Sequence, residues 1–191
     1  MTQNSFDVAV IGAGAAGLNA ALILGQARRS VIVFDNGSPR NAAADHMLRE
    51  AYAKVADTAD ESPIVHIETR EIRALRRAGG VIWFDFATLC GGPRSQNDYL
   101  ELASRFHTVI LSSIPAMSAG QSSEARRFTW LVDVFYDHKV KLIMSAAVEP
   151  EELYTQGMLA NEFHRTVSRI IEMQSREYML AERRGAADAI A

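Results

Sequence analysis

Three glycines near the N-terminus constrain the fold of this chain more than any other feature. Gly12, Gly14 and Gly17 follow a short apolar run at 6–11, which is typical of a buried parallel strand. An Ala/Leu-rich helical stretch comes next, and a second, β-branched run follows at 30–34. The order of strand, glycine turn, helix and strand predicts a Rossmann-type βαβ unit.

The glycine spacing also indicates a chemistry. The first glycine permits a tight turn, the second lets a pyrophosphate approach the backbone, and the third lets the helix pack closely on the strand. The pyrophosphate would lie at the helix N-terminus, and Asp35 would accept hydrogen bonds from a ribose. The candidate cofactor contacts are Gly12, Gly14, Ala15, Gly17 and Asp35. The alternative is a glycine-rich helix start that binds no ligand.

The segment DVAVIGAGAAGLNAALILGQARRSVIVFDNGSPRN resembles the N-terminus of thioredoxin-reductase-like flavoproteins, and the resemblance covers residues 5–47. It implies that this unit holds the ADP half of FAD, with Arg40 in the turn beside the cofactor. The family's second GxGxxG and its redox CxxC do not occur in this sequence, and Cys90 alone cannot form a dithiol. Because one βαβ unit supplies few of the contacts to a flavin, we expect FAD retention to be weak or lost.

The pattern changes after residue 47. Dense alternating charges predict an exposed linker at 48–63. Beyond it, short apolar runs alternate with amphipathic stretches, as in α/β domains. Ser95 and Asp98 have the spacing of a capping box at a helix start. The expected strands lie at 64–68, 72–75, 81–86, 108–111 and 140–144, and the expected helices lie at 96–106, 124–138 and 161–183.

Three segments of this second part resemble the C-terminal half of the ZapE-type ATPases, which are AAA+-related P-loop proteins. They are VIWFDFATLCGGPRSQNDYLELASRFHTVILSSIP, EARRFTWLVDVFYDHKVKLIMSAAVEPEELY and FHRTVSRIIEMQSREY, within a match over 49–184. The resemblance implies ATP binding and hydrolysis and association with the cell-division machinery. The family's Walker elements lie upstream of this region, and no GxxxxGK[ST] occurs in this sequence. ATP and Mg²⁺ would therefore bind only if another chain completed the site.

These inferences predict an α/β fold with a mostly parallel sheet and flanking helices. An incomplete βαβ unit at 1–47 and the linker at 48–63 would precede a partial P-loop-ATPase-like domain at 64–191. Because a 47-residue piece buries too little surface to be stable alone, it should dock on the larger part or remain partly disordered. The leading function is a ZapE-like ATPase with doubtful activity of its own. An FAD-binding module of an oxidoreductase and a non-catalytic interaction domain are the alternatives.

Several arginines allow two interpretations. Arg165 and Arg169 could contact a nucleotide at a subunit interface, or could lie on a solvated face beside Glu162 and Glu172. The same two alternatives apply to the Arg126-Arg127 pair. Arg94 could help the turn at 91–95 to hold a phosphate, although an ordinary helix cap with a solvated arginine is favoured.

Other candidate groups point to structure rather than chemistry. Asp133 and Asp137 have metal-ligand spacing but no matching second pair, so a solvated face is favoured. Asp85 ends an apolar strand without a following Glu and is interpreted as structural. Cys90 is expected to be a small buried hydrophobe, since no motif places a base beside it.

Composition excludes further classes of function. With 20 Lys+Arg against 23 Asp+Glu, the net charge of −3 disfavours nucleic-acid binding. One cysteine and five unclustered histidines disfavour a metal site. The run at 8–25 is apolar, but its glycines and the acidic residue before it argue against a signal peptide or a transmembrane segment. We expect a cytoplasmic protein with a protein partner or a homo-oligomeric state.

Overall fold

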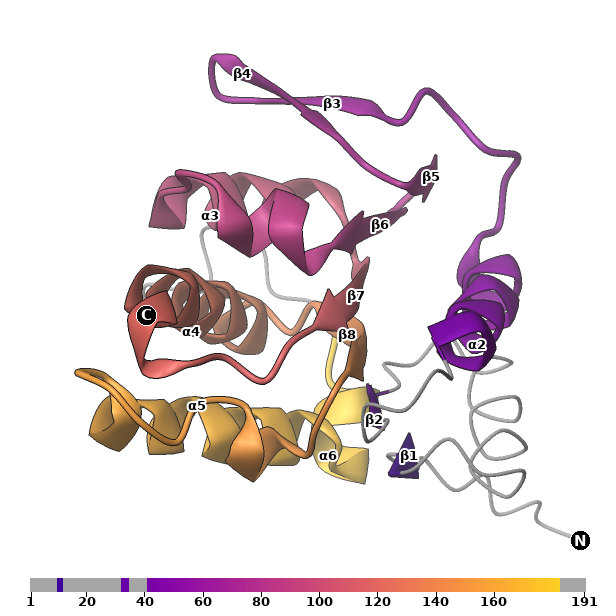
Figure 1. The fold of residues 1–191 in the computed structure, drawn as a ribbon. Coiled ribbons are helices and arrows are strands. Elements are labelled where there is room, and N and C mark those ends of the chain that lie inside the picture. The colour runs from indigo at the N-terminus through magenta and orange to yellow at the C-terminus, as the bar shows by residue number, and fades with distance from the viewer. Residues whose placement is uncertain (1–9, 12–31, 35–40, 183–191) are drawn as a thin grey trace, which may run out of the picture.

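The computed structural model describes residues 10–11, 32–34 and 41–182. Its main sheet has six strands in the order β1-β2-β8-β7-β6-β5 (Figure 1). The strands are β1 (Val10–Ile11), β2 (Ile32–Phe34), β5 (Arg76–Ala78), β6 (Val81–Asp85), β7 (Thr108–Ile114) and β8 (Lys141–Ala146). Along the sheet order, the neighbouring strands β1, β2, β8, β7 and β6 pair in parallel. Strand β5 at the edge pairs with β6 in antiparallel. The expected α/β class with a mostly parallel sheet is confirmed.

The two strands of the N-terminal unit belong to the same sheet as the rest of the domain. Ile32 and Val33 of β2 lie in register with Met144 and Ser145 of β8. Strand β2 thus pairs with the larger part, which is one of the two outcomes expected for the short unit. The glycine turn and the helix expected between β1 and β2 lie outside the described residues.

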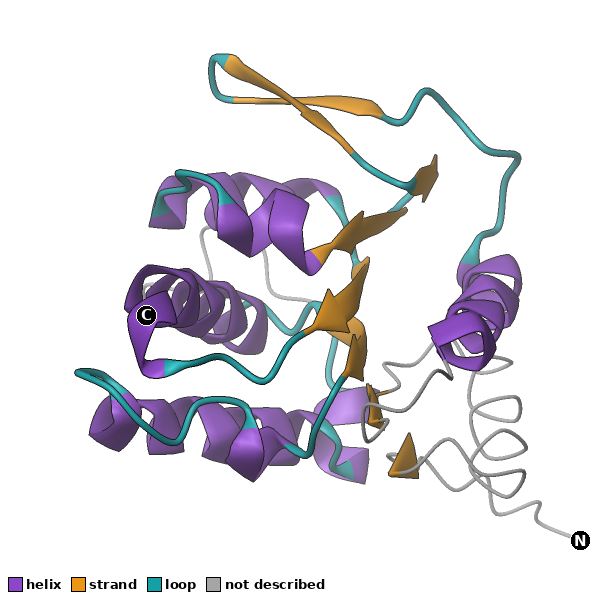
Figure 2. Cartoon of the chain, viewed as in Figure 1, coloured by secondary structure: helices purple, strands orange, loops and turns teal. Residues whose placement is uncertain are grey.

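Helices cover both faces of the sheet (Figures 1 and 2). Helix α2 (Asn41–Val55) covers one face, and α3 (Gln96–Arg105), α4 (Ser122–Asp137) and α5 (Ala160–Met173) cover the other. The remaining elements are α6 (Arg176–Leu180) and the short turns η1 (Ala87–Gly91), η2 (Ala119–Gln121) and η3 (Pro150–Glu152).

Alternation along the central strands divides the core into two layers. Val109 and Leu111 of β7 pack toward α3 and α4, whereas Ile110 packs toward α2. Phe84 and Trp83 of β6 separate in the same way. Successive side chains of a strand point to opposite faces, so near-continuous apolar runs are what a sheet buried on both faces requires.

Helix α2 corrects the expectation of an exposed linker over 48–55, whereas residues 56–63 form no helix or strand and are mostly exposed, as expected. Leu48, Ala51, Tyr52 and Val55 are all buried against the sheet. Their spacing of three and four residues places them on one helical face. The dense charges of this segment lie on the other faces of the helix and in the loop after it, which is why charge alone was misleading.

The last predicted helix is interrupted. Instead of one helix over 161–183, α5 ends at Met173 and α6 begins at Arg176. The Ser175 hydroxyl accepts a hydrogen bond from the backbone N–H of Tyr178 at 3.2 Å and so caps α6. Serine competes well for backbone donors at helix starts, and this capping separates the two helices.

A separate hairpin lies above α3 in Figure 1. It consists of β3 (Ile64–Ile67) and β4 (Arg70–Arg73), paired in antiparallel. The backbone N–H of Glu68 at its tip donates to Glu101 Oε2 on α3 at 2.6 Å. The Arg105 guanidinium, also on α3, donates to the carbonyl of His66. These contacts fix the hairpin over the second half of α3.

Candidate functional site

The residues expected to bind a dinucleotide cannot be placed. Gly12, Gly14, Ala15, Gly17, Asp35 and Arg40 lie outside the described residues. Only the strands on either side of the glycine turn are described, and they pair in parallel as a βαβ unit requires. The prediction of a cofactor site there stays a prediction.

Arg165 and Arg169 of α5 form ion pairs with α4. An Arg165 Nη2 lies 2.9 Å from Asp133 Oδ2, and Arg169 Nη1 lies 2.7 Å from Asp133 Oδ1. Arg169 also lies 3.8 Å from Asp137. The carboxylates beside these arginines therefore come from the neighbouring helix, and not from Glu162 and Glu172 on α5 itself. Asp133 and Asp137, which were expected to lie on a solvated face, therefore form ion pairs with these arginines.

The structure brings other arginines together in a cavity of about 420 Å³, here called the arginine pocket. The pocket lies where β4, the N-terminal end of α3 and the first half of α4 meet. Its lining residues are Arg70, Pro93, Arg94, Ser95, Ser123, Arg126, Arg127 and Trp130. Sequence reasoning considered Arg94 and the Arg126-Arg127 pair separately, and it missed Arg70, because no linear spacing connects β4 to α3.

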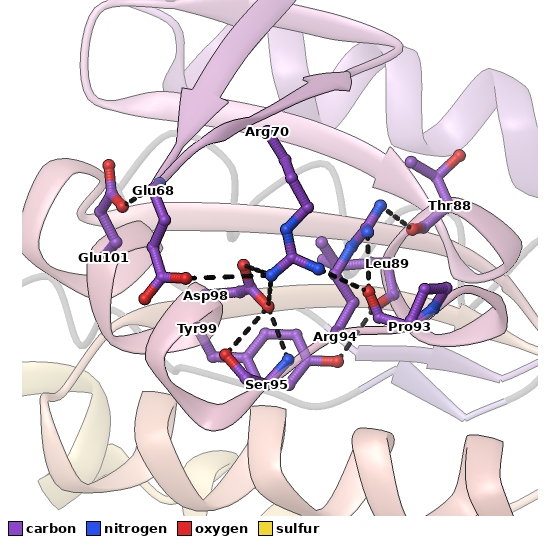
Figure 3. Close-up of polar contacts among 10 residues, drawn as sticks. All are labelled: Glu68, Arg70, Thr88, Leu89, Pro93, Arg94, Ser95, Asp98, Tyr99 and Glu101. Carbon is purple, nitrogen blue, oxygen red and sulfur yellow. Dashed lines mark hydrogen bonds and ion pairs between the residues drawn. The ribbon is translucent and has the colours of Figure 1, made fainter.

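Arg70 is anchored by a buried carboxylate (Figure 3). Its Nη2 donates to both oxygens of Asp98, at 2.6 and 2.8 Å, and its Nη1 donates to the carbonyl of Pro93 at 3.0 Å. Asp98 is fully buried and also accepts from the backbone N–H of Ser95 at 2.5 Å. The predicted capping box of α3 is confirmed, and its acid also positions an arginine at the pocket.

Arg94 and Arg127 are held by backbone carbonyls. Arg94 donates to the carbonyls of Thr88 and Pro93, each at 3.0 Å, and its buried Nε has no partner among the described residues. Arg94 is thus half-buried and folds back over the π-helical turn η1, so it is only partly solvated. Arg127 Nε donates to the carbonyl of Cys90 at 2.5 Å, and its Nη2 lies 4.0 Å from Glu124.

Arg126 differs from the other three arginines. It is exposed and makes no hydrogen bond or ion pair with any described residue. Among the lining residues the structure gives, none is acidic. Two arginines of the pocket, Arg94 and Arg126, thus lack a carboxylate partner in the described part of the chain. Guanidinium groups without such partners can bind an anion through charge-assisted hydrogen bonds.

The remaining candidate groups have structural roles. Asp85 accepts from the backbone N–H of Thr88 at 2.6 Å, at the start of η1. Cys90 is fully buried, and burial raises the pKa of its thiol to about 12. In the described part of the chain, no cluster of His, Cys, Asp and Glu has the geometry to hold a metal ion.

Comparison with known proteins identifies the family. A family model described as AFG1-like ATPase matches residues 26–182. This chain belongs to the AFG1-like ATPase family. The match begins upstream of residue 49, where the expected resemblance to ATPases starts, so it overlaps the part that resembles flavoproteins.

Two relatives agree with this assignment. The chain is 43% identical to the cell division protein ZapE of Escherichia coli over 123 residues, which cover 64% of this chain and 33% of that protein. It is 31% identical to lactation elevated protein 1 homolog B of Danio rerio over 182 residues, covering 78% of this chain and 36% of that protein. The chain thus spans about a third of the length of these relatives. The expected resemblance to ZapE-type ATPases is confirmed at the level of the family.

The similarity to flavoproteins is partial. The chain is 40% identical to the thioredoxin reductase sirT of Leptosphaeria maculans over 79 residues, which cover 41% of this chain and 23% of that protein. No solved structure matches the chain. Within the described residues, none of the helices combines the length and the hydropathy that a membrane crossing requires.

Proposed function

We propose that this chain acts as the C-terminal part of a ZapE-like ATPase and depends on another chain for the site that cleaves ATP. The observation that carries the proposal is the family match over 26–182 in a sequence that has no GxxxxGK[ST]. P-loop catalysis needs a backbone cradle for the phosphates, a lysine on the β/γ oxygens, and Mg²⁺ held by a hydroxyl and an acid. This sequence does not contain these groups as a unit.

Arg165 and Arg169 are the residues we propose to act toward a nucleotide held by a second chain. The Arg165 side chain is 64% exposed, and its ion pair with Asp133 lies at the surface. Exposed ion pairs contribute little free energy, so a phosphate could replace the aspartate at small cost. Arg169 is more enclosed, with 24% of its side chain exposed, and it holds two carboxylates. Arg165 would therefore reach a nucleotide more readily than Arg169.

Phosphate release with Mg·ATP tests the proposal. The chain alone should give no turnover, and a mixture with a separately expressed ATPase half that carries Walker A should give turnover. Arg165→Ala and Arg169→Ala should lower turnover in the mixture. Arg73→Ala is the matched control, because Arg73 is an exposed arginine on β4 without an ion pair to any described residue. Turnover by the chain alone, lost on Asp85→Ala, would contradict the proposal.

Association with a cell-division partner is a further part of this proposal. It is supported by the 43% identity to a protein named for cell division. Because the matched region covers 33% of that protein, the partner-binding surface must lie within the shared segment for the proposal to hold. Co-purification of the tagged chain with division proteins, compared with the Arg73→Ala and Arg165→Ala variants, tests it. Absence of any division protein from the purified material would count against it.

FAD binding by the N-terminal glycines is the second candidate function. It is supported by the partial identity to a thioredoxin reductase and by the parallel pairing of β1 with β2. Since one βαβ unit offers contacts to the ADP half alone, we expect flavin absorbance to be lost during gel filtration. In an FAD titration, Asp35→Ala should remove ribose hydrogen bonds and Gly14→Val should block the pyrophosphate. Unchanged affinity in both variants would exclude this site.

A further inference from the structure

The arginine pocket is an open hollow between elements that the fold holds firmly. Its β4 wall is fixed by Arg70, whose guanidinium binds buried Asp98 at 2.6 Å. The opposite wall is α4, where Arg127 is fixed on the carbonyl of Cys90 and where Ser123 and Trp130 also line the cavity. Because Arg70 and Arg127 are already held in place, an anion that binds in the pocket would not have to order their side chains.

The charge of the pocket is only partly compensated. Asp98 and, at 3.9 Å, Glu68 balance Arg70, and Glu124 lies 4.0 Å from Arg127. Arg94 and Arg126 have no carboxylate partner among the described residues, so the four arginines outnumber the three carboxylates beside them and the pocket keeps a net positive charge. The chain as a whole is acidic, with a net charge of −3, so this concentration of arginine does not follow from composition.

We infer that the arginine pocket binds a polyphosphate group, either free or as part of a nucleotide. Guanidinium groups match phosphate oxygens in paired hydrogen bonds, and the hydroxyls of Ser95 and Ser123 can add further donors. A volume of about 420 Å³ is within the range of small-molecule sites. Arg94 and Arg126 lie on different elements and have no carboxylate partner among the described residues, which favours a group with several anionic oxygens over a single carboxylate. The inference does not rest on the proposed function, since every residue involved belongs to this chain.

Calorimetric titration of the intact chain with inorganic pyrophosphate tests this inference. Pyrophosphate should bind, and Arg126→Ala should weaken binding roughly tenfold, as expected for one lost charge-assisted hydrogen bond. Arg126 is exposed and has no contact to maintain, so its variant should fold normally. Arg126→Lys should fall between the two, because lysine keeps the charge but loses the paired geometry. Ser123→Ala is a second, milder variant on the same wall.

Two controls separate the pocket from other phosphate sites. Arg73→Ala removes an exposed arginine outside the pocket and should leave affinity unchanged. Gly14→Val tests the glycine motif of the N-terminal unit as an alternative site for pyrophosphate. A parallel titration with ADP assigns the source: equal affinities indicate that the polyphosphate suffices, and tighter ADP binding indicates a nucleotide.

Three results would overturn the inference. The first is no pyrophosphate binding up to about millimolar concentration. The second is binding that Arg126→Ala does not weaken, or that Arg73→Ala weakens equally. The third is pyrophosphate binding lost in Gly14→Val, which would assign the site to the glycine motif. None of these results depends on a second chain or on ATP turnover, so failure here is distinguishable from failure of the proposed function.

Discussion

Arg70 and Asp98 join the hairpin to the start of α3 across 28 positions of sequence. Asp98 is fully buried, and only 1% of its side chain is exposed, whereas 38% of the Arg70 side chain remains exposed. The same carboxylate also accepts from the Ser95 backbone N–H, as Figure 3 shows. One acid thus caps a helix, ties down a hairpin and orients an arginine at the pocket.

Arg70→Ala should destabilise the fold by about 2–4 kcal/mol, because it leaves a buried carboxylate without its cation. Urea denaturation followed by circular dichroism measures the change in the free energy of unfolding. Arg73→Ala on the same strand is the control and should change it by less than about 0.5 kcal/mol, since Arg73 is exposed. Equal effects of the two substitutions would show that the buried pair has no special role.

The acid dependence of stability should include a contribution from Asp60. The Tyr52 hydroxyl donates to Asp60 Oδ1 at 2.8 Å, and Arg76 Nε donates to Oδ2 at 2.9 Å. The hydrogen bond from Tyr52, followed by that from Arg76, lowers the pKa of Asp60 below its ordinary value of 3.8. A carboxylate with a lowered pKa in the fold stabilises it above the ordinary pKa, and the contribution is lost as pH falls through the lowered value.

Tyr52→Phe should raise the pKa of Asp60 toward 3.8 and reduce this acid dependence. An NMR pH titration of the Asp60 carboxyl carbon measures the pKa directly. Tyr136→Phe is the matched control, because the Tyr136 hydroxyl donates to Glu172 at the other side of the domain. The assignment to Tyr52 would be wrong if the pKa of Asp60 were the same in the Tyr52 variant and the original chain.

Gly157→Ala should destabilise the fold by about 1–3 kcal/mol. The φ of Gly157 is +121°, and an added Cβ would lie 2.1 Å from Tyr154 Oη and 3.2 Å from the Cα of Ala119. Tyr154 is buried and its hydroxyl contacts the Ser122 hydroxyl at 3.0 Å, so moving the ring breaks a second interaction. Thermal unfolding measures the effect, with Gly92→Ala as the control because no atom lies within 4 Å of its added Cβ. A melting temperature lowered equally by both changes would contradict this account.

Cys90 should not react with a thiol reagent in the folded chain at neutral pH. Its side chain is fully buried, and its pKa of about 12 leaves almost no thiolate. A colorimetric disulfide reagent should detect one thiol per chain in denaturant and close to none without it. Fast reaction of the folded chain would indicate that η1 opens readily.

Local sequence determined those features that depend on neighbouring residues. The spacing of Phe128, Leu131, Val132 and Phe135 predicted α4, and all four side chains are buried. Ser95 and Asp98, three residues apart, predicted the helix start. The same rule applied to Leu48 and Tyr52 would have found α2, because they also lie on one helical face. A periodic apolar pattern suffices here, since it places the apolar residues of one helix on a single face.

The tertiary structure alone decided which distant residues meet. The sheet order β2-β8-β7-β6 places the N-terminal strands beside the ATPase-like part, and the packing of α5 on α4 brings Arg165 to Asp133. The arginine pocket likewise requires β4, α3 and α4 together. Sequence periodicity carries information about one element at a time, whereas burial of both sheet faces selects the arrangement among elements. Arg70 and Asp98 therefore form a pair only because the tertiary structure places β4 beside the start of α3.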